Sequence, residues 1–370
     1  MLAGRKRALA TVDLSAIRHN VSRLAEPLPP GCAYCAVVKA NGYGHGAAAV
    51  AREAVAAGAR WLGVATVDEA EELRGYGLTQ PLLIFGPLTG AELERAVHAH
   101  ADVVVWTQSF LVEALRHGAR VHLKLDSGMG RLGATEATVE RLAELADEAG
   151  QLVGLMSHFA TADRRDEFFA FQLDRFLALA TKLKRRYPGL IAHTANSAAT
   201  LWEPRAWNDM VRCGIAMYGL APANDNPDAD GLLPALSLSS YVAAVREVVP
   251  GQSVGYGRTF VAERPTRVGV VPIGYADGVA RALSNRGEVL VNGRRCRIRG
   301  TISMDQLTVE LPSGVGRAGD TVTFIGVSGS ERILAEDVAR LLGTINYEVV
   351  CDIGPRVERR YIGEPSASSD

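Results

Sequence analysis

The sequence carries almost no net charge and few residues of the kinds that cross-link a chain. Its 40 Lys and Arg residues against 41 Asp and Glu leave a formal charge of −1 at pH 7. A chain without a strong positive field is poorly suited to gather nucleic acid or anionic membrane, so we expect neither kind of partner. Only five cysteines occur, an odd number, which argues against a disulfide framework and favours reduced thiols.

Long hydrophobic runs are also missing. No segment approaches the ~20 apolar residues of a membrane-spanning helix, and no apolar core of signal-peptide length follows the basic start MLAGRKR. We therefore expect a cytoplasmic protein. What the sequence does have is a 48% hydrophobic composition, typical of a globular protein. Its 370 residues are more than a single hydrophobic core ordinarily organises, so two domains are expected.

The first part of the chain has the pattern of repeated βα units. Short apolar runs alternate with stretches of helical periodicity, such as 46–58, 91–100 and 136–150. Eight strands are predicted, at 32–40, 62–66, 82–86, 102–106, 121–126, 152–158, 191–197 and 210–219. Eight consecutive βα units close into a barrel more readily than they form an open sheet, so we predict a (β/α)8 TIM-type barrel; an open doubly wound sheet is the alternative.

A mostly β C-terminal domain is predicted next. After about residue 235 the runs alternate with turn signals, and Asn292-Gly293 between two of them indicates a hairpin. One helix is expected at 334–342. The predicted division is a barrel domain at 1–233, a β-rich domain at 234–363 and a disordered tail at 364–370. Residues 1–14 are open to two outcomes, pairing into the β domain or leading into a helix that opens at Asp13 or Ser15.

Polar side chains follow the predicted strands at the same end, which in such barrels carries the active site. Taken singly, each of these side chains could have a purely structural role. A lysine could lie along the surface, a histidine could pack in the core, an arginine could form an ion pair and a serine could cap a helix. Their occurrence at the ends of consecutive strands favours a site. These residues are Lys39, Lys124, Arg131, His158, Asn196, Ser197 and Arg212.

Two further patterns are weaker. Residues 42–47 (GYGHGA) satisfy the G-x-G-x-x-G/A dinucleotide pattern, but eight βα units and a lysine just before the first glycine do not suit that fold. Cys32 and Cys35 have C-x-x-C spacing without a second pair at zinc-site distance, so core packing is the favoured role and no metal site is predicted.

Eight segments together resemble the alanine racemases that depend on pyridoxal 5'-phosphate (PLP). They run in order from about residue 10 to 360: AVVKANGYGHGA, HLKLDSGMGRLG, MSHFATAD, TANSAA, VRCGIAMYG, VGYGRTF, PIGYADG and ISMDQLTVE. The resemblance implies a PLP-binding barrel followed by a mostly β domain, and an isomerase that interconverts L- and D-alanine to supply peptidoglycan. It also implies two-base proton transfer at the Cα of a substrate joined to PLP.

The resemblance assigns a role to each candidate residue. Lys39 is implied to be the covalent anchor of PLP and the base for D-alanine, and Tyr256 the base for L-alanine, assisted by His158 hydrogen-bonded to Arg212. Arg212 is also implied to face the pyridine nitrogen of the cofactor. The phosphate ligands implied are Tyr43, Asn196, Ser197, Gly214 and Ile215. The substrate-binding residues implied are Arg131, Met304 and Tyr275, and Lys124 matches a position that is carbamylated in many members.

Tyr256 and Met304 reach the partner subunit's site in that family, so a homodimer with shared active sites is implied. The sequence departs from some members at Pro355, where a phosphate-contacting tyrosine is found. Three alternatives stay open: a racemase of broader or shifted specificity, for example for serine, a non-catalytic PLP carrier, and a PLP decarboxylase of the barrel type. The β domain counts against the carrier, and Arg212 counts against the decarboxylase, which uses an acidic partner for the pyridine nitrogen.

Overall fold

The computed structural model describes residues 6–363, so the predicted tail at 364–370 lies outside the described residues. The chain separates into two compact units. Of the described residues, one unit comprises Ile17–Met217 with Asp230–Leu232; the other comprises residues 6–16, Tyr218–Ala229 and 233–363. This grouping differs from the predicted boundary at 233/234, because it places Tyr218–Ala229 with the second unit.

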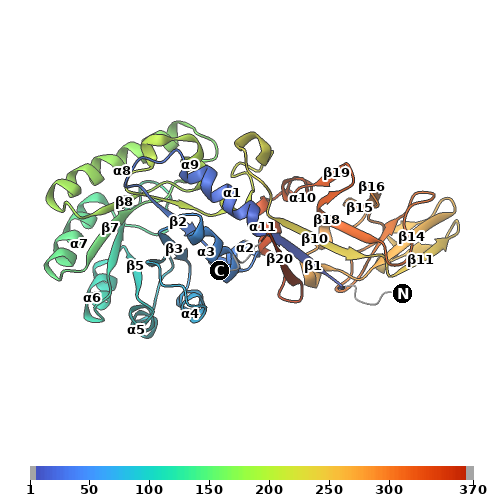
Figure 1. The fold of residues 1–370 in the computed structure, drawn as a ribbon, viewed down its shortest axis with the longest axis horizontal. Coiled ribbons are helices and arrows are strands. Elements are labelled where there is room, and N and C mark those ends of the chain that lie inside the picture. Colours follow the sequence, from blue (N-terminus) through green and yellow to red (C-terminus); the bar gives the residue numbers. More distant parts are fainter. Residues whose placement is uncertain (1–5, 364–370) are drawn as a thin grey trace, which may run out of the picture. The chain divides into compact units, whose positions relative to one another are not determined.

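The first unit is an eight-stranded parallel barrel, which confirms the predicted fold class and rules out the open sheet (Figure 1). Its strands are β2 (Ala33–Val37), β3 (Trp61–Val64), β4 (Leu82–Ile84), β5 (Ala101–Val105), β6 (Val121–Lys124), β7 (Leu152–Met156), β8 (Ile191–His193) and β9 (Met210–Cys213). The strand order is β8-β7-β6-β5-β4-β3-β2-β9. Two backbone bonds bring the ends of this order together: Asp209 N–H donates to Ala192 O at 3.0 Å, and Arg212 N–H to Ala195 O at 3.0 Å.

Helices lie outside the strands (Figure 1). They are α1 (Leu14–Ala25), α2 (Lys39–Tyr43), α3 (Ala47–Ala56), α4 (Val67–Gly75), α5 (Gly90–His98), α6 (Gln108–Arg116), α7 (Glu136–Glu148), α8 (Glu167–Arg186) and α9 (Ser197–Trp202). Side-chain oxygens fix where many of them begin. Thr66 and Thr89 form capping boxes, and Thr107, Thr135 and Asp166 accept from the backbone N–H three residues on.

The barrel interior is packed with apolar side chains. A core cluster joins Cys35, Trp61, Leu83, Val104, Met156 and Met210. Cys35 thus packs in the core, as expected for the C-x-x-C pair, and Cys32, Cys213 and Cys296 are likewise free thiols. Within residues 6–363, no group of three or more His, Cys, Asp and Glu residues is placed to hold a metal ion, and no helix is long and apolar enough to cross a membrane.

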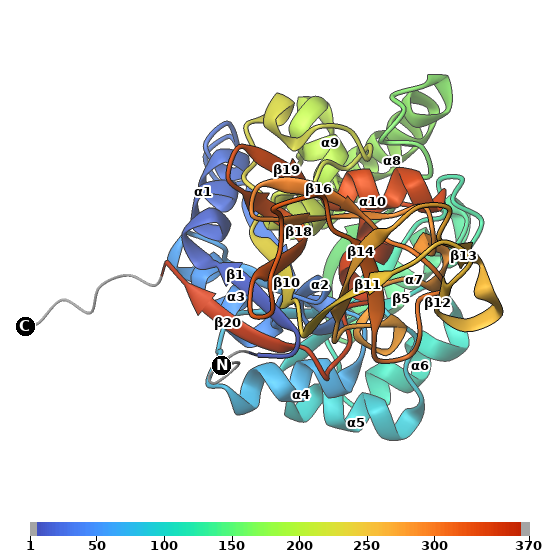
Figure 2. The ribbon, with the colours of Figure 1, turned by 90° about the vertical axis from the view of Figure 1, so that its right-hand side faces the viewer.

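The second unit is mostly β (Figure 2). Its strands are β1 (Leu9–Asp13), β10 (Leu236–Tyr241), β11 (Ala244–Val248), β12 (Ser253–Val254), β13 (Phe260–Val261), β14 (Thr266–Val271), β15 (Glu288–Val291), β16 (Arg294–Arg297), β17 (Leu307–Glu310), β18 (Thr321–Ser328), β19 (Glu331–Ile333) and β20 (Glu358–Ile362). A seven-stranded sheet has the order β16-β15-β18-β10-β1-β20 with β19 on β18, and β11-β14-β17 form a second sheet. The helix predicted at 334–342 is α10 (Ala335–Leu342), while α11 (Asn346–Cys351) was not predicted.

Two local predictions concern backbone pairing in this unit. Asn292 and Gly293 have φ of 49° and 73° between β15 and β16, the left-handed turn that a two-residue hairpin needs. Both outcomes considered for the N-terminal residues occur. β1 pairs antiparallel with β10 and parallel with β20, and α1 begins directly after it, where Asp13 Oδ1 accepts from Ser15 N–H at 2.9 Å.

Candidate active site

The lysine predicted at a strand end lies instead at the start of α2. β2 ends at Val37, and the chain then enters a left-handed turn in which Ala40, Asn41 and Gly42 have φ of 51°, 51° and 60°. Left-handed geometry costs about 1–2 kcal/mol for each residue with a Cβ, and such strain is typical of functional sites. Asn41 stabilises the turn, because its Oδ1 accepts from Ala47 N–H at 3.0 Å. The predicted strand 32–40 was therefore too long.

An anion cradle lies where this turn meets the ends of β8 and β9. Ser197 Oγ accepts from Gly214 N–H at 3.0 Å and from Ala216 N–H at 3.3 Å, so it is not the cap of α9. Asn196 is that cap, since its Oδ1 accepts from Ala199 N–H at 3.0 Å. A Cβ on Gly214 would lie 2.4 Å from the Tyr43 hydroxyl, so that hydroxyl presses against the backbone of Gly214.

Donors converge at this cradle. They come from two side-chain hydroxyls, Tyr43 and Ser197, and from the turn that opens the 3₁₀ segment Ile215–Tyr218. Gly214 and Ile215 are buried, and β9 ends at Cys213 rather than at the predicted residue 219. Hydroxyl and backbone N–H groups at the start of helical segments suit a phosphate group. The residues present therefore fit the phosphate of PLP.

Four cations surround His158. Burial lowers the pKa of His158 to about 3, and the charges of Arg212, Lys124, Arg131 and Lys39 act in the same direction. The ring is therefore neutral at pH 7. Burial, followed by the charges of Arg131 and Arg212, also lowers the pKa of Lys124 to about 8. A cluster this rich in positive charge suits an anionic ligand.

Arg212 is buried, and its hydrogen bonds go to neutral acceptors. Its Nη1 donates to His193 Nδ1 at 2.9 Å and to His193 O at 2.8 Å; its Nη2 donates to Ser157 O at 2.8 Å and Thr194 O at 3.2 Å. Burial lowers the pKa of Arg212 to about 10, so the guanidinium stays charged at pH 7. Among the described residues, the bond expected between Arg212 and His158 is not formed; the Nη groups donate instead to His193, Ser157 and Thr194.

The loop that carries Arg131 is held by Asp126. Its Oδ1 accepts from Gly128 N–H at 3.0 Å and from Gly130 N–H at 3.1 Å. Burial alone would raise the pKa of Asp126, but these backbone donors hold it below its usual value. Arg131 itself is exposed, so its guanidinium is available to a small anionic ligand.

The remaining predicted residues belong to the second unit, where Tyr275 and Met304 lie on two joined turns. Tyr275 N–H donates to Ser303 O and Ala276 N–H to Met304 O, both at 3.1 Å. Tyr256 opens a 3₁₀ turn, Tyr256–Arg258, beside a hollow of about 820 Å³. The exposed fractions are 73% for Tyr256, 42% for Tyr275 and 50% for Met304, which is high for large apolar or aromatic side chains.

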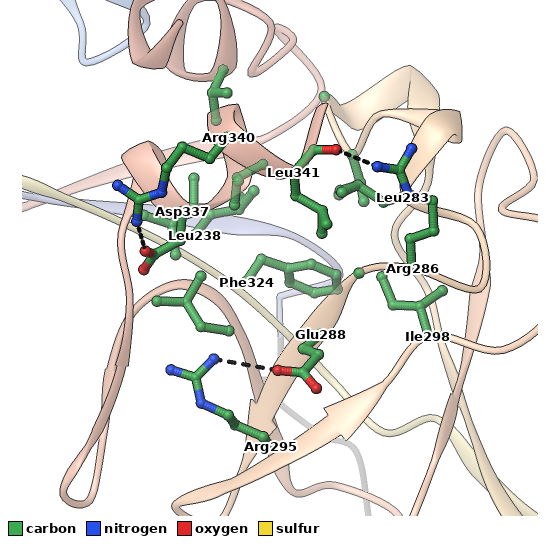
Figure 3. Close-up of a pocket in the computed structure, with 17 residues that line it drawn as sticks. Leu238, Leu283, Arg286, Glu288, Arg295, Ile298, Phe324, Asp337, Arg340 and Leu341 are labelled. Carbon is green, nitrogen blue, oxygen red and sulfur yellow. Dashed lines mark hydrogen bonds and ion pairs between the residues drawn. The ribbon is translucent and has the colours of Figure 1, made fainter. Parts of the chain in front are cut away.

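A separate cavity of about 540 Å³ lies within the second unit (Figure 3). Its walls are apolar, with Leu238, Leu283 and Phe324 among them. Of the charged groups around it, Arg295 pairs with Glu288 at 3.4 Å and Arg340 with Asp337. Arg286 Nη2 donates to Leu341 O at 2.8 Å. None of the predicted site residues lines this cavity, so it is not the candidate active site.

Sequence reasoning missed three buried polar residues behind Arg212. They are Asp102, His122 and His193, each no more than 5% exposed. A signal for His122 existed, because it lies two residues before Lys124 on a strand and thus shares its face. Nothing in the sequence linked it to His193, 71 residues away.

Comparisons with known proteins agree on one family. The family model described as alanine racemase, N-terminal domain, matches residues 12–222, and that of the alanine racemase C-terminal domain matches residues 235–361. The chain is 42% identical to the alanine racemase of Symbiobacterium thermophilum, over 98% of this chain and 99% of that protein. It is 45% identical to the alanine racemase of Geobacillus kaustophilus, over 94% and 92%.

Solved structures give the same result. The crystal structure of alanine racemase from D-cycloserine-producing Streptomyces lavendulae superposes with a TM-score of 0.92 at 39% identity, covering 97% of this chain and 98% of that one. The crystal structure of alanine racemase from Bacillus anthracis with bound L-Ala-P gives 0.88 at 38% identity, covering 97% and 96%.

Proposed function

This chain belongs to the alanine racemase family and interconverts L- and D-alanine, and we propose that it does so with two bases, Lys39 and the partner subunit's Tyr256. The observation that carries the proposal is the division of the chemistry between the two units. The barrel collects Lys39, His158 and Arg212 at one mouth, whereas Tyr256 projects from the β unit with 73% of its surface exposed. A base that is so exposed in one subunit can act on substrate when it lies against the barrel of another subunit.

PLP is the proposed cofactor, with Lys39 as its covalent anchor and the cradle of Tyr43, Ser197, Gly214 and Ile215 as its phosphate site. The fit of that cradle to a phosphate supports the proposal. When bound there, PLP supplies an electron sink for the charge that develops at the substrate Cα. Asn196 caps α9 beside the cradle and so fixes the position of Ser197.

Arg212 is proposed to determine how strongly the cofactor would withdraw electrons. Its acceptors are a ring nitrogen and three carbonyl oxygens, so no carboxylate neutralises its charge directly. An arginine does not give up its proton at pH 7, and facing the pyridine nitrogen it would keep that nitrogen unprotonated. A sink weakened in this way would favour return of the proton to Cα over other outcomes.

A tyrosine needs help to act as a base at neutral pH, because the phenol pKa is ordinarily about 10. We propose that the neutral ring of His158 and the surrounding cations stabilise the phenolate of the partner subunit's Tyr256. Opposite charges near a phenol favour its ionised form. Lys39 then holds or returns the proton on one face of Cα, and the tyrosine does so on the other.

The substrate carboxylate is proposed to bind Arg131 and the backbone N–H of the partner subunit's Met304, with the partner subunit's Tyr275 narrowing the entrance. Lys124 adds a further proposal. Its pKa of about 8 leaves roughly a tenth of the amine neutral at pH 7. That fraction can add to carbon dioxide and lose a proton, and the resulting carbamate anion would pair with Arg131.

These assignments imply a homodimer with shared active sites. We also propose that the enzyme works in the cytoplasm and supplies D-alanine for peptidoglycan. The free thiols of Cys32, Cys35, Cys213 and Cys296 suit a reducing compartment.

The test is a circular-dichroism assay of purified enzyme with L-alanine, L-serine and L-lysine. Racemisation of alanine is expected, and Lys39→Ala should lose both activity and the absorbance of covalently bound PLP. Tyr256→Phe should slow exchange of the α-proton of L-alanine into solvent about tenfold or more beyond its effect on D-alanine, since only one base is lost. Equal loss of the two exchange rates would contradict the two-base assignment.

A further inference from the structure

A line of polar side chains crosses the barrel interior behind Arg212. Arg212 Nη1 donates to His193 Nδ1 at 2.9 Å, His193 Nε2 lies 2.8 Å from His122 Nδ1, and His122 Nε2 lies 3.2 Å from Asp102 Oδ2. Both imidazoles are fully buried, and Asp102 is 5% exposed. Barrel interiors are ordinarily filled with apolar branched side chains, so this line needs an explanation.

A glycine makes the crossing possible. His122 is on β6 and His193 on β8, so β7 runs between them. Gly154 of β7 pairs in register with His122 on one side and Ile191 on the other. A Cβ at Gly154 would lie 2.2 Å from His122 Nδ1, so any side chain there would block the contact between the two rings.

The chemistry of the two end residues determines which way each hydrogen bond in the line donates. An arginine can only donate and a carboxylate can only accept. His193 Nδ1 must therefore accept from Arg212, which leaves the proton of the neutral ring on Nε2, donating to His122 Nδ1. His122 in turn carries its proton on Nε2 and donates to Asp102. Burial and the charge of Arg212 hold the pKa of His193 well below its usual value, which agrees with a neutral ring.

The far end of the line reaches the surface. Asp102 accepts from Arg120 Nε at 2.9 Å, and the Arg120 side chain is 59% exposed. The distant carboxylate is therefore the anion linked to the buried charge of Arg212, through two neutral rings. Hydrogen bonds that all point the same way polarise one another, which strengthens the acceptor that His193 presents to Arg212.

We propose that Asp102, His122 and His193 are positioning residues that hold the Arg212 guanidinium in place and fully charged at the mouth of the barrel. A carboxylate in direct contact would hold the group but offset its charge; a carboxylate two imidazoles away holds it without doing so. The inference rests on the proposed function in one respect, which is that Arg212 faces the nitrogen of PLP.

The first test does not depend on that function. Protein labelled with ¹⁵N at histidine is examined by NMR with the cofactor removed. Both His122 and His193 should carry the proton on Nε2, and His193 should stay neutral between pH 6 and 8. A proton on Nδ1 of either ring, or protonation of His193 in that range, would overturn the inference. His45, buried outside the line, serves as an internal reference.

Two variants then test positioning in the holoenzyme. Gly154→Ala interrupts the line without removing a polar group, and Asp102→Asn removes the distant charge while keeping an acceptor oxygen. Each should shift the ¹⁵N resonances of both rings. Gly154→Ala should lower kcat for alanine about tenfold with KM changed less than about twofold, and Asp102→Asn should lower kcat about threefold.

The matched control is Asp209→Asn. Asp209 directly precedes the barrel strand β9, pairs with Lys184 at 2.6 Å and accepts from Ala192 N–H at 2.8 Å, but it hydrogen-bonds to neither histidine ring. It should leave kcat and both ring resonances unchanged. If Asp102→Asn and Gly154→Ala alter only thermal stability and leave kcat unchanged, the proposed positioning role is wrong. This holds even if NMR finds the expected tautomers of His122 and His193. If Gly154→Ala does not fold, Asp102→Asn alone decides.

Discussion

At the scale of one residue, the lowered pKa of the partly buried His158 ring reflects its surroundings. It is neutral because burial and four nearby cations oppose its protonation. The same cations are what an anionic cofactor and substrate require, so the low pKa of the ring and the chemistry of the site have one cause.

This lowered pKa predicts an effect on acid stability. Between about pH 6.5 and pH 3 the unfolded chain binds a proton at His158 that the folded chain does not, so stability falls as pH falls through that window. From pH 7 to pH 5 we expect the free energy of unfolding to drop about 2 kcal/mol more in the wild type than in His158→Gln. Urea unfolding at several pH values measures this difference. Parallel stability curves would show that the ring titrates normally.

For other site residues, the sequence predicted which residues were candidates but not which partners they contact. The candidates Lys39, Lys124, Arg131, His158 and Arg212 could be proposed because parallel strands end at one face of a barrel. The partner of Arg212 could not. Whether its guanidinium meets His158 or His193 depends on strand stagger and on the missing side chain at Gly154, which residue types alone do not specify.

At the scale of elements, the eight strands followed from periodicity, and their boundaries did not. The predicted strands 32–40, 191–197 and 210–219 all run too far, because the chain leaves each strand for a helical segment: α2 from Lys39, α9 from Ser197 and the 3₁₀ segment Ile215–Tyr218. The left-handed turn after Lys39 is the clearest case. Ala40 and Asn41 adopt φ of 51° there, a conformation that their own propensities disfavour and that the surrounding bonds impose.

The junction of β9 with the segment after it carries a prediction. A methyl group at Gly214 would lie 2.4 Å from the Tyr43 hydroxyl and 2.8 Å from its ring, so one of them must move. Gly214→Ala should therefore weaken PLP binding about tenfold, measured by titration of apoenzyme at the cofactor absorbance. Gly189→Ala is the control, because a Cβ there meets nothing within 4 Å. Equal affinity in the two variants would contradict the phosphate cradle.

At the scale of the whole molecule, the proposed site residues are divided between a barrel and a β unit. The sequence predicted both units, because a change from βα repeats to alternating strands is visible in the pattern. It did not predict that Tyr218–Ala229 joins the β unit, since that grouping depends on long-range contacts. The proposed dimer follows from this division, as each site would take Lys39 from one copy and Tyr256 from another.

Complementation between two inactive variants tests this central claim most directly. Lys39→Ala and Tyr256→Phe are each dissociated, mixed and allowed to reassociate, and alanine racemisation is followed by circular dichroism. In a mixed dimer, one site regains both bases and the other loses both. Random mixing makes half of the dimers mixed, so activity should rise to about a quarter of the wild-type value. A mixture that stays as inactive as its components, with mixed dimers shown to form, would contradict the shared site.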